Sequence, residues 1–245
     1  MRVAFLGATK GMGRALARRM AERGDVLCLL GRNPEDLERS AADLRIHGGG
    51  AEVHCVPCDL EKPETFSIAI AAAREALDGL HVVVISAGIF ATQDELEADA
   101  ELTERLLRVD FTNTLLFCEA AKKALLKEGG GTLCAFSSVA GERGRKPVIL
   151  YGAAKAGLTR YLEGLDHKHS ADGLHVITVK PGFVKTSMTA GLPPPPFAGE
   201  PDGVALRVLR AIDRGTPVVY APSAWRLIMA VIRALPRALM RRIGF

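Results

Sequence analysis

The sequence predicts an α/β domain in which helices cover both faces of a doubly wound, mostly parallel sheet of seven strands. Three observations predict it. Short apolar runs alternate with helical stretches along the chain, a glycine-rich turn follows the first apolar run, and 245 residues suffice for one large core. Because no internal repeat or interior linker divides the chain, we expect a single domain.

Seven apolar runs have the length and composition of buried strands. They are residues 2–6, 26–30, 53–57, 81–85, 132–137, 175–180 and 218–220. Apolar residues at helical spacing between these runs predict helices at residues 14–23, 34–47, 63–77, 101–127 and 150–170. This alternation is typical of βαβ units, in which each helix connects two parallel strands.

The turn after the first strand reads Gly-Ala-Thr-Lys-Gly-Met-Gly over residues 7–13. Glycines in this position permit a tight turn and a close approach of the backbone to a ligand. The helix that follows offers free N–H groups and a positive dipole end, which favour a pyrophosphate. The turn therefore predicts a dinucleotide site, and we expect the contacts to come from Gly7, Thr9, Lys10, Gly11, Met12 and Gly13.

Tyr151 and Lys155 lie four residues apart, so a helix would place both side chains on one face. A neighbouring ammonium stabilises a phenolate, and it should lower the tyrosine pKa from about 10 toward neutrality. Such a phenol can donate a proton to a carbonyl oxygen. Ser138 lies thirteen residues before Tyr151 and Ser137 is its competitor; alternation along the strand would point the two serines to opposite sides.

The glycine turn together with Ser138, Tyr151 and Lys155 resembles the short-chain dehydrogenase/reductase family, and the resemblance covers essentially the whole chain. It implies a Rossmann fold, an NAD(P)H cofactor, and reduction of a ketone with Tyr151 as the general acid. Ser138 would hold the carbonyl oxygen, and Lys155 would also bind the nicotinamide ribose. Further cofactor contacts implied by the resemblance are Asp59 and Leu60 for adenine, the Ser86-Ala87-Gly88 segment, and Pro181, Gly182, Val184 and Thr186 for the nicotinamide.

The sequence departs from the family at Asp110, where an asparagine usually helps to hold a water that relays protons to the lysine. A carboxylate there could hold the same water or pair with Lys155. It could also raise the lysine pKa and weaken the effect on Tyr151. Asn113 lies three residues further on and could take the asparagine's role instead.

The cofactor is expected to be NADPH rather than NADH. The second strand ends at Gly31 and Arg32 without the acidic residue that would bind a ribose 2′-hydroxyl. Lys10 and Arg32 could together bind a 2′-phosphate. Asp25 and Asp36 are expected to lie too far along their elements to take the acidic role.

Residues 186–203 correspond to the segment that covers the substrate in the family, and Met188, Leu192 and Phe197 are its candidate apolar contacts. Basic residues before the tyrosine, Arg143, Arg145 and Lys146, could bind a substrate phosphate. These residues and the end of the chain resemble the reductases of a decaprenylphosphoryl 2-keto pentose, which implies a lipid-linked keto sugar. A general reductase of small, steroid or acyl ketones and an NADP(H)-sensing regulator remain alternatives.

Residues 1–222 are expected to form the catalytic domain and residues 223–245, ending at Phe245, a separate basic tail. The last 32 residues contain six arginines and no acidic residue, whereas the rest of the chain has 26 basic and 28 acidic residues. A basic amphipathic helix kinked at Pro236 would suit a membrane surface, and packing on the body is the alternative. We expect a cytoplasmic protein, with peripheral binding to the inner membrane face if the tail contacts lipid, and without a metal site or nucleic-acid partner. The resemblance implies a homodimer or homotetramer.

Overall fold

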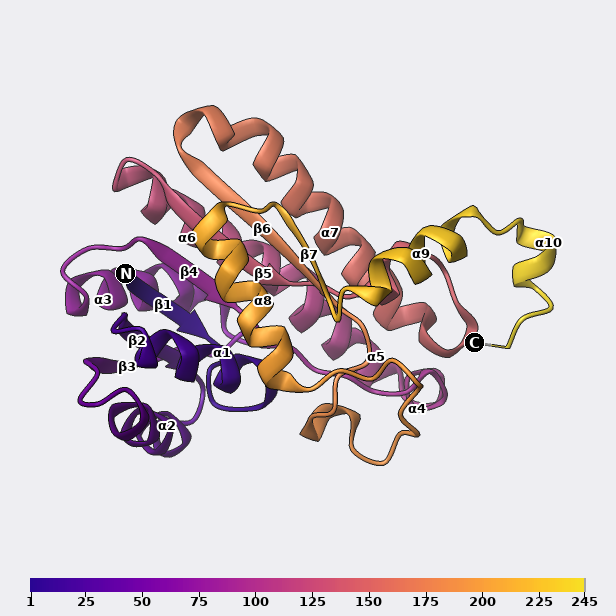
Figure 1. Cartoon of the computed structure of the whole chain (residues 1–245), viewed down its shortest axis with the longest axis horizontal. Helices are drawn as coiled ribbons and strands as arrows, with labels where there is room; N and C mark the ends of the chain where they lie inside the picture. The colour runs from indigo at the N-terminus through magenta and orange to yellow at the C-terminus, as the bar shows by residue number, and fades with distance from the viewer. Residues whose placement is uncertain (245) are drawn as a thin grey trace.

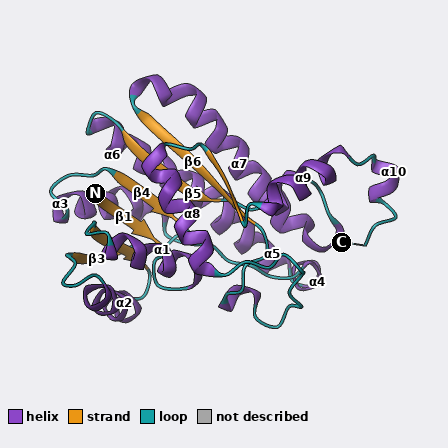
Figure 2. Ribbon diagram, in the orientation of Figure 1, coloured by secondary structure: helices purple, strands orange, loops and turns teal. Residues whose placement is uncertain are grey.

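Seven parallel strands form one sheet in the order β3-β2-β1-β4-β5-β6-β7, with helices on both faces (Figures 1 and 2). The computed structural model describes residues 1–244, so Phe245 lies outside the described residues. The strands are β1 (Arg2–Leu6), β2 (Val26–Gly31), β3 (Val53–Pro57), β4 (Val82–Ile85), β5 (Gly131–Phe136), β6 (Leu174–Pro181) and β7 (Val218–Ala221). The predicted fold class, a single Rossmann-like α/β domain, is confirmed.

Three helices cover each face of the sheet. One layer contains α1 (Gly11–Glu22), α2 (Pro34–His47) and α8 (Pro201–Arg214), and the other contains α3 (Phe66–Ala76), α6 (Thr114–Lys127) and α7 (Ile149–His169). Alternation along the strands produces the two cores, because Val3 and Phe5 pack toward the first layer while Ala4 and Leu6 pack toward the second. The strands are therefore buried on both faces, which explains their continuous apolar runs.

The single helix predicted over residues 101–127 is wrong in its middle. The chain forms α5 (Ala100–Leu107), a π-helical turn at Arg108–Asn113, and then α6. The hydroxyl of Thr114 donates a hydrogen bond to the carbonyl oxygen of Val109 at 2.7 Å, five residues earlier. A π-turn of this kind is often found at functional sites, and this one carries Asp110. The short helix α4 (Gln93–Ala98), capped by Thr92, was not predicted.

The C-terminal arm, residues 223–244, projects from one end of the body in Figure 1. It contains α9 (Ala224–Ala234) and the short α10 (Arg237–Met240), so the predicted kink at Pro236 is a complete break between two helices. The inner side of α9 buries Trp225, Met229 and Ile232 against Val139 of the body. In residues 1–244, no helix combines the length and apolar character that crossing a membrane requires.

Candidate active site

The carboxyl ends of the strands meet around a cavity of about 470 Å³, called the main cavity below. Ligands of open parallel sheets bind at this edge, where the order of the strands reverses. Here the reversal lies between β1 and β4, which flank the glycine turn. The lining contains fourteen residues that the sequence assigned to the cofactor or substrate: Gly7, Thr9, Lys10, Gly11, Met12, Gly13, Arg32, Asp59, Leu60, Ser86, Ala87, Gly88, Thr186 and Met188.

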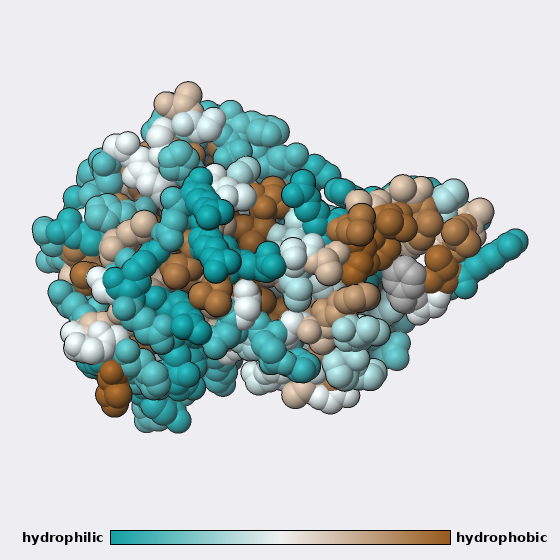
Figure 3. All heavy atoms as spheres, viewed as in Figure 1, coloured by the Kyte–Doolittle hydropathy of each residue, from teal (hydrophilic) through white to brown (hydrophobic). Residues whose placement is uncertain are grey.

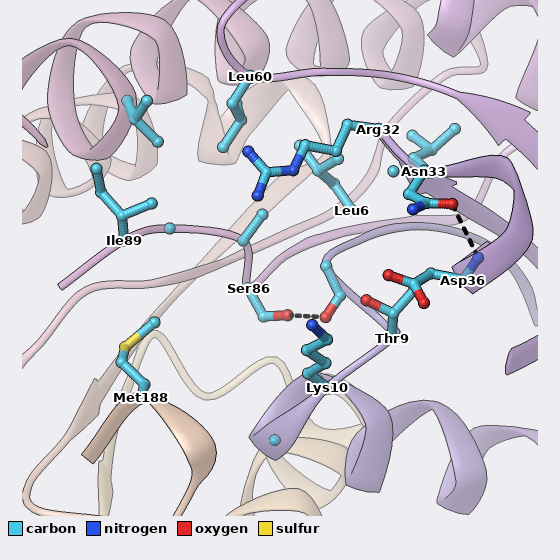
Figure 4. Close-up of a pocket in the computed structure, with 18 of the residues that line it drawn as sticks. Leu6, Thr9, Lys10, Arg32, Asn33, Asp36, Leu60, Ser86, Ile89 and Met188 are labelled. Carbon is cyan, nitrogen blue, oxygen red and sulfur yellow. Dashed lines mark hydrogen bonds between the residues drawn. The ribbon is translucent and has the colours of Figure 1, made fainter. Parts of the chain in front are cut away.

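The glycine turn is packed so closely that two of its glycines cannot carry a side chain. Gly7 has a φ of +97°, and a Cβ there would lie 2.4 Å from the backbone nitrogen of Ala87. A Cβ on Gly13 would lie 2.1 Å from the carbonyl oxygen of Gly7. Ser86 stands where the family usually has asparagine, and its hydroxyl donates to the Gly7 carbonyl at 3.0 Å (Figure 4). These contacts fix the turn at the N-terminus of α1.

Both basic and acidic residues line the main cavity near Arg32, at the end of β2. Arg32 and Lys10 line it from different elements (Figure 4), and Arg32 also lies 3.6 Å from Glu61. Asp36 was expected to lie too far along its element to take the acidic role, but it lines the main cavity. Its carboxylate lies beside Thr9 in the lining, because the first turn of α2 folds back over the end of β2. Asp25, in contrast, pairs with the N-terminal amine, away from the cavity.

Buried Asp110 and Lys155 lie with the half-buried Tyr151 beyond the main cavity. One Asp110 oxygen accepts a hydrogen bond from the backbone N–H of Ile89 at 2.8 Å, and the other lies 3.2 Å from the Lys155 ammonium. Lys155 lies 5.6 Å from the centre of the Tyr151 ring, as expected for neighbours one helical turn apart on α7. Asn113 does not take Asp110's place, because its amide donates to the carbonyl oxygen of Leu60.

The pKa of Tyr151 lies above its ordinary value, opposite to the sequence-based expectation. Burial raises it most, Lys155 and the Ser138 hydroxyl act to lower it, and Asp110 adds to the increase. Burial is the largest single influence and acts to lower the pKa of Lys155, but Asp110 and Tyr151 together outweigh it, so this pKa is raised. The Asp110 carboxylate therefore favours the protonated, charged form of Lys155. It also raises the pKa of the Tyr151 phenol, which Lys155 acts to lower.

The two serines at the end of β5 are separated by the alternation of the strand. The Ser137 hydroxyl is buried against α7, where it contacts the Lys155 carbonyl oxygen at 3.0 Å and the Thr159 hydroxyl at 2.7 Å. Ser138 faces the other way, and its hydroxyl oxygen accepts from the backbone N–H of Ala140 at 3.1 Å. Ser137 thus anchors α7, while Ser138 remains on the side of Tyr151.

Phe90 connects the main cavity to Tyr151 and was missed in the sequence. It lines the cavity, and its ring packs edge-on against Tyr151 with 5.2 Å between ring centres. The sequence signal that could have identified Phe90 was its position, four residues after Ser86, which directly follows β4. Other lining residues that the sequence did not assign to the site are Leu6, Leu30, Gly31, Asn33, Asp36, Cys58, Glu61, Ile89, Val109 and Ser187.

Several residues assigned from the sequence line no part of the main cavity as described. Gly182 packs against Trp225 of the arm, and Val184 forms a strand-like bridge with Gly199. Leu192 borders a separate shallow hollow, and Phe197 is exposed. The remaining members of this group are Ser138, Tyr151, Lys155, Asp110, Pro181, Arg143, Arg145 and Lys146.

Two of the three basic residues before Tyr151 bind the C-terminal arm. The Arg143 guanidinium donates to the carbonyl oxygen of Leu235 at 2.9 Å, and the Lys146 ammonium donates to that of Arg241 at 2.9 Å. Arg145 differs, because its Nε is buried without a hydrogen-bond partner among residues 1–244, and burial lowers its pKa. Within these same residues, no group of three or more potential ligand side chains could hold a metal ion.

A glycine turn at the switch point of a parallel sheet, beside a Tyr–Lys pair on one helix face, defines a dinucleotide-dependent oxidoreductase. The family model for short chain dehydrogenases matches residues 2–195. The chain therefore belongs to the short-chain dehydrogenase/reductase family and is an oxidoreductase.

Relatives of similar length support this assignment. An uncharacterized oxidoreductase of Mycobacterium tuberculosis is 33% identical over 241 residues, which cover 98% of this chain and 96% of that protein. An uncharacterized oxidoreductase of Streptomyces coelicolor is 34% identical, covering 97% of this chain and 94% of that protein. Among solved structures, a short-chain dehydrogenase from Sphingobium yanoikuyae in complex with NADPH aligns with a TM-score of 0.82 and 26% identity, covering 99% of this chain and 96% of that chain.

Proposed function

We propose that this protein is an NADPH-dependent reductase that converts a ketone to an alcohol. The observation that carries the proposal is the half-buried Tyr151 beside the buried Lys155, next to a cavity bounded by the glycine turn. The Sphingobium yanoikuyae relative, which was solved with NADPH, supports a nicotinamide cofactor.

The glycine turn fits a dinucleotide, because a Cβ at Gly7 or Gly13 would clash with the backbone of Ala87 or of Gly7 and so open the tight turn that lets the backbone approach a pyrophosphate. Free N–H groups at the start of α1 would bind its phosphates. Asp59 and Leu60 would bind its adenine end, and Thr186 lines the cavity beside Gly11. A bound nicotinamide cofactor would supply a hydride.

In the proposed reaction, Tyr151 donates its phenolic proton to the substrate oxygen. Ser138 holds the same oxygen and stabilises the charge that develops on it. Lys155 binds the cofactor ribose and stabilises the phenolate that remains, since an ammonium favours a neighbouring negative charge. Asp110 holds the lysine in its charged form at a distance of 3.2 Å.

The proposed preference for NADPH depends on Lys10 and Arg32. Both line the main cavity, and a guanidinium can bind two oxygens of a 2′-phosphate at once. Glu61 and Asp36 oppose this preference, because a carboxylate repels a 2′-phosphate. Glu61 lies near Arg32, and Asp36 lines the same cavity. A 2′-phosphate would compete with Glu61 for the arginine.

The proposed substrate is a ketone on a phosphate-linked lipid sugar. Arg145 supports this, because its side chain is half-buried, its Nε lacks a hydrogen-bond partner in the described chain, and a guanidinium can bind an anion. Arg143 and Lys146 are less suited to the phosphate, since both already bind carbonyl oxygens of the arm. Met188 offers an apolar contact at the cavity wall, and Leu192 and Phe197 lie further along the proposed covering segment, residues 186–203.

We further propose that the C-terminal arm lies on an anionic membrane surface. Residues opposite the packed side of α9 form an exposed apolar face, called the outer face, of Ala224, Leu227, Ala230, Val231 and Ala234. Brown, apolar atoms gather over the arm in Figure 3. The six arginines from Arg214 onward would add attraction to anionic lipids, about 1 kcal/mol for each one near the surface.

The test is turnover of wild-type protein and Tyr151→Phe with NADPH on a panel of lipid-phosphate-linked keto sugars and simple ketones. We expect wild type to prefer the lipid-linked compounds, and the variant to lose more than about 99% of turnover because it has no acidic proton to donate. Fluorescence titration should show unchanged NADPH affinity in the variant. Wild-type protein that binds NADPH and reduces no carbonyl compound would contradict the proposal, and equal turnover of simple ketones would contradict the substrate.

A further inference from the structure

Glu142 is a buried carboxylate that the proposed reaction does not use. It lies four residues after Ser138, and only 3% of its side chain is exposed. One of its oxygens accepts hydrogen bonds from the Lys180 ammonium, at 2.7 Å, and from the Tyr220 hydroxyl. Burial acts to raise the pKa of Glu142, but these two partners outweigh it and hold the pKa below its usual value.

The partners of Glu142 come from strands that end beside the site. Lys180 lies near the end of β6, and its ammonium lies 5.5 Å from the ring centre of Tyr220 on β7. Immediately after β6 the chain passes through Gly182 to Thr186, which lines the main cavity and would lie 3.3 Å from a Cβ on Gly11. Glu142 thus joins the segment that carries Ser138 to the strand that leads into the cofactor wall.

The C-terminal arm is attached at the same place. Arg233 of α9 lies 3.8 Å from the second oxygen of Glu142, which has no hydrogen-bond partner among the described residues. The next residue, Arg143, binds the end of α9 through the Leu235 carbonyl. Trp225 packs so closely on Gly182 that a Cβ there would lie 2.0 Å from its ring nitrogen.

We propose that Glu142 is a positioning residue that fixes the segment after β6 against the Ser138 segment, and so holds the cavity wall that receives the nicotinamide half of the cofactor. This inference rests on the proposed function, because it assumes a dinucleotide with its adenosine half near Arg32. The adenosine half lies at the ends of β2 and β3, which Glu142 does not contact. Loss of the Glu142 charge should therefore affect one half of the cofactor and spare the other.

The physical reason is the burial of Lys180, whose side chain is only 10% exposed. Removing the charge of its partner leaves a buried ammonium without a counterion, which is strongly unfavourable. The end of β6 must then shift to hydrate it, and Gly182 to Thr186 shift with it. Removing both charges together should relieve this cost, because the remaining pair is neutral.

The experiment compares the binding of NADPH with that of 2′,5′-ADP, which contains only the adenosine half, in intact full-length protein. In Glu142→Gln we expect NADPH to bind about tenfold more weakly while 2′,5′-ADP changes less than about twofold. The double variant Glu142→Gln/Lys180→Gln should recover most of the NADPH affinity. Glu128→Gln is the matched control, because Glu128 also pairs with an arginine but lies at the end of α6; it should change neither ligand.

Equal weakening of both ligands in Glu142→Gln would overturn the inference, since it indicates general loss of structure. Unchanged NADPH binding would overturn it as well. Tyr220→Phe, which keeps the ion pair and removes one hydrogen bond, gives a milder second test; it should weaken NADPH about threefold and spare 2′,5′-ADP. Wild-type protein that binds neither ligand would instead contradict the proposed function.

Discussion

The carboxylate of Asp110 lies close to the Lys155 ammonium, with almost no access to water. Because it also accepts a hydrogen bond from the Ile89 backbone, its position is fixed from two sides. A buried ion pair is stable only when such partners compensate for lost hydration. The consequence for chemistry is a Tyr151 phenol that keeps its proton to a higher pH than a tyrosine beside a lone lysine would.

The variant Asp110→Asn should shift the pH dependence of ketone reduction. Reduction requires protonated Tyr151, so the rate falls as pH rises through the tyrosine pKa. Removing the carboxylate removes one cause of the raised pKa, and the fall in kcat/KM should move to lower pH by about one unit. The measurement is kcat/KM against pH, with Asp43→Asn on α2 as the control. An unshifted profile would show that Asp110 does not act on the phenol.

Arg32→Ala should distinguish the two cofactors. The guanidinium is expected to bind the 2′-phosphate, so NADPH affinity should fall about tenfold, whereas NADH affinity should change less than about twofold. Both are measured by fluorescence titration, with Arg160→Ala on α7 as the control for loss of a surface charge. If both cofactors weaken equally, Arg32 contacts a part that they share.

At the scale of elements, the sequence predicted most strands to within a residue at each end. Continuous apolar runs between turns identify buried strands well. The helix over residues 101–127 was predicted too simply, because apolar spacing cannot show the π-helical turn at Arg108–Asn113. The arm's helix was predicted as amphipathic. The sequence could not show that α9 has one apolar face packed on the body and a second one exposed. Spacing alone does not tell which apolar side of a helix packs.

The element that most directly tests membrane contact is α9. Leu227 on its outer face is 73% exposed, so Leu227→Glu should leave the fold intact while weakening binding to vesicles containing anionic lipid about tenfold or more. Ile68→Glu on α3 is a matched control, because Ile68 is 72% exposed on the main body. Co-sedimentation with vesicles of 30% phosphatidylglycerol measures the effect. Equal binding of wild type and Leu227→Glu would exclude the outer face as the contact.

At the scale of the whole molecule, the parallel sheet gathers the site at one edge. The sequence positions of three features were predictable: the glycine turn, Ser138 and the Tyr151–Lys155 pair. Short motifs at strand ends and on one helix face define them. The Glu142–Lys180–Tyr220 cluster was not predictable, because its members are separated by 38 and 78 residues and share no motif. The place of Asp36 was also missed, since it depends on how α2 folds back over β2.

Trp225 is the only tryptophan in the chain, and it lies where the arm meets the segment after β6. Its ring contacts Gly182 and is largely shielded from solvent. The tryptophan fluorescence of the protein therefore originates from a single, known junction. A shift of this emission to longer wavelength would report separation of the arm from the body. Energy transfer from Trp225 to a reduced nicotinamide would report binding of the cofactor nearby. The unlabelled protein thus carries its own optical probe of both events.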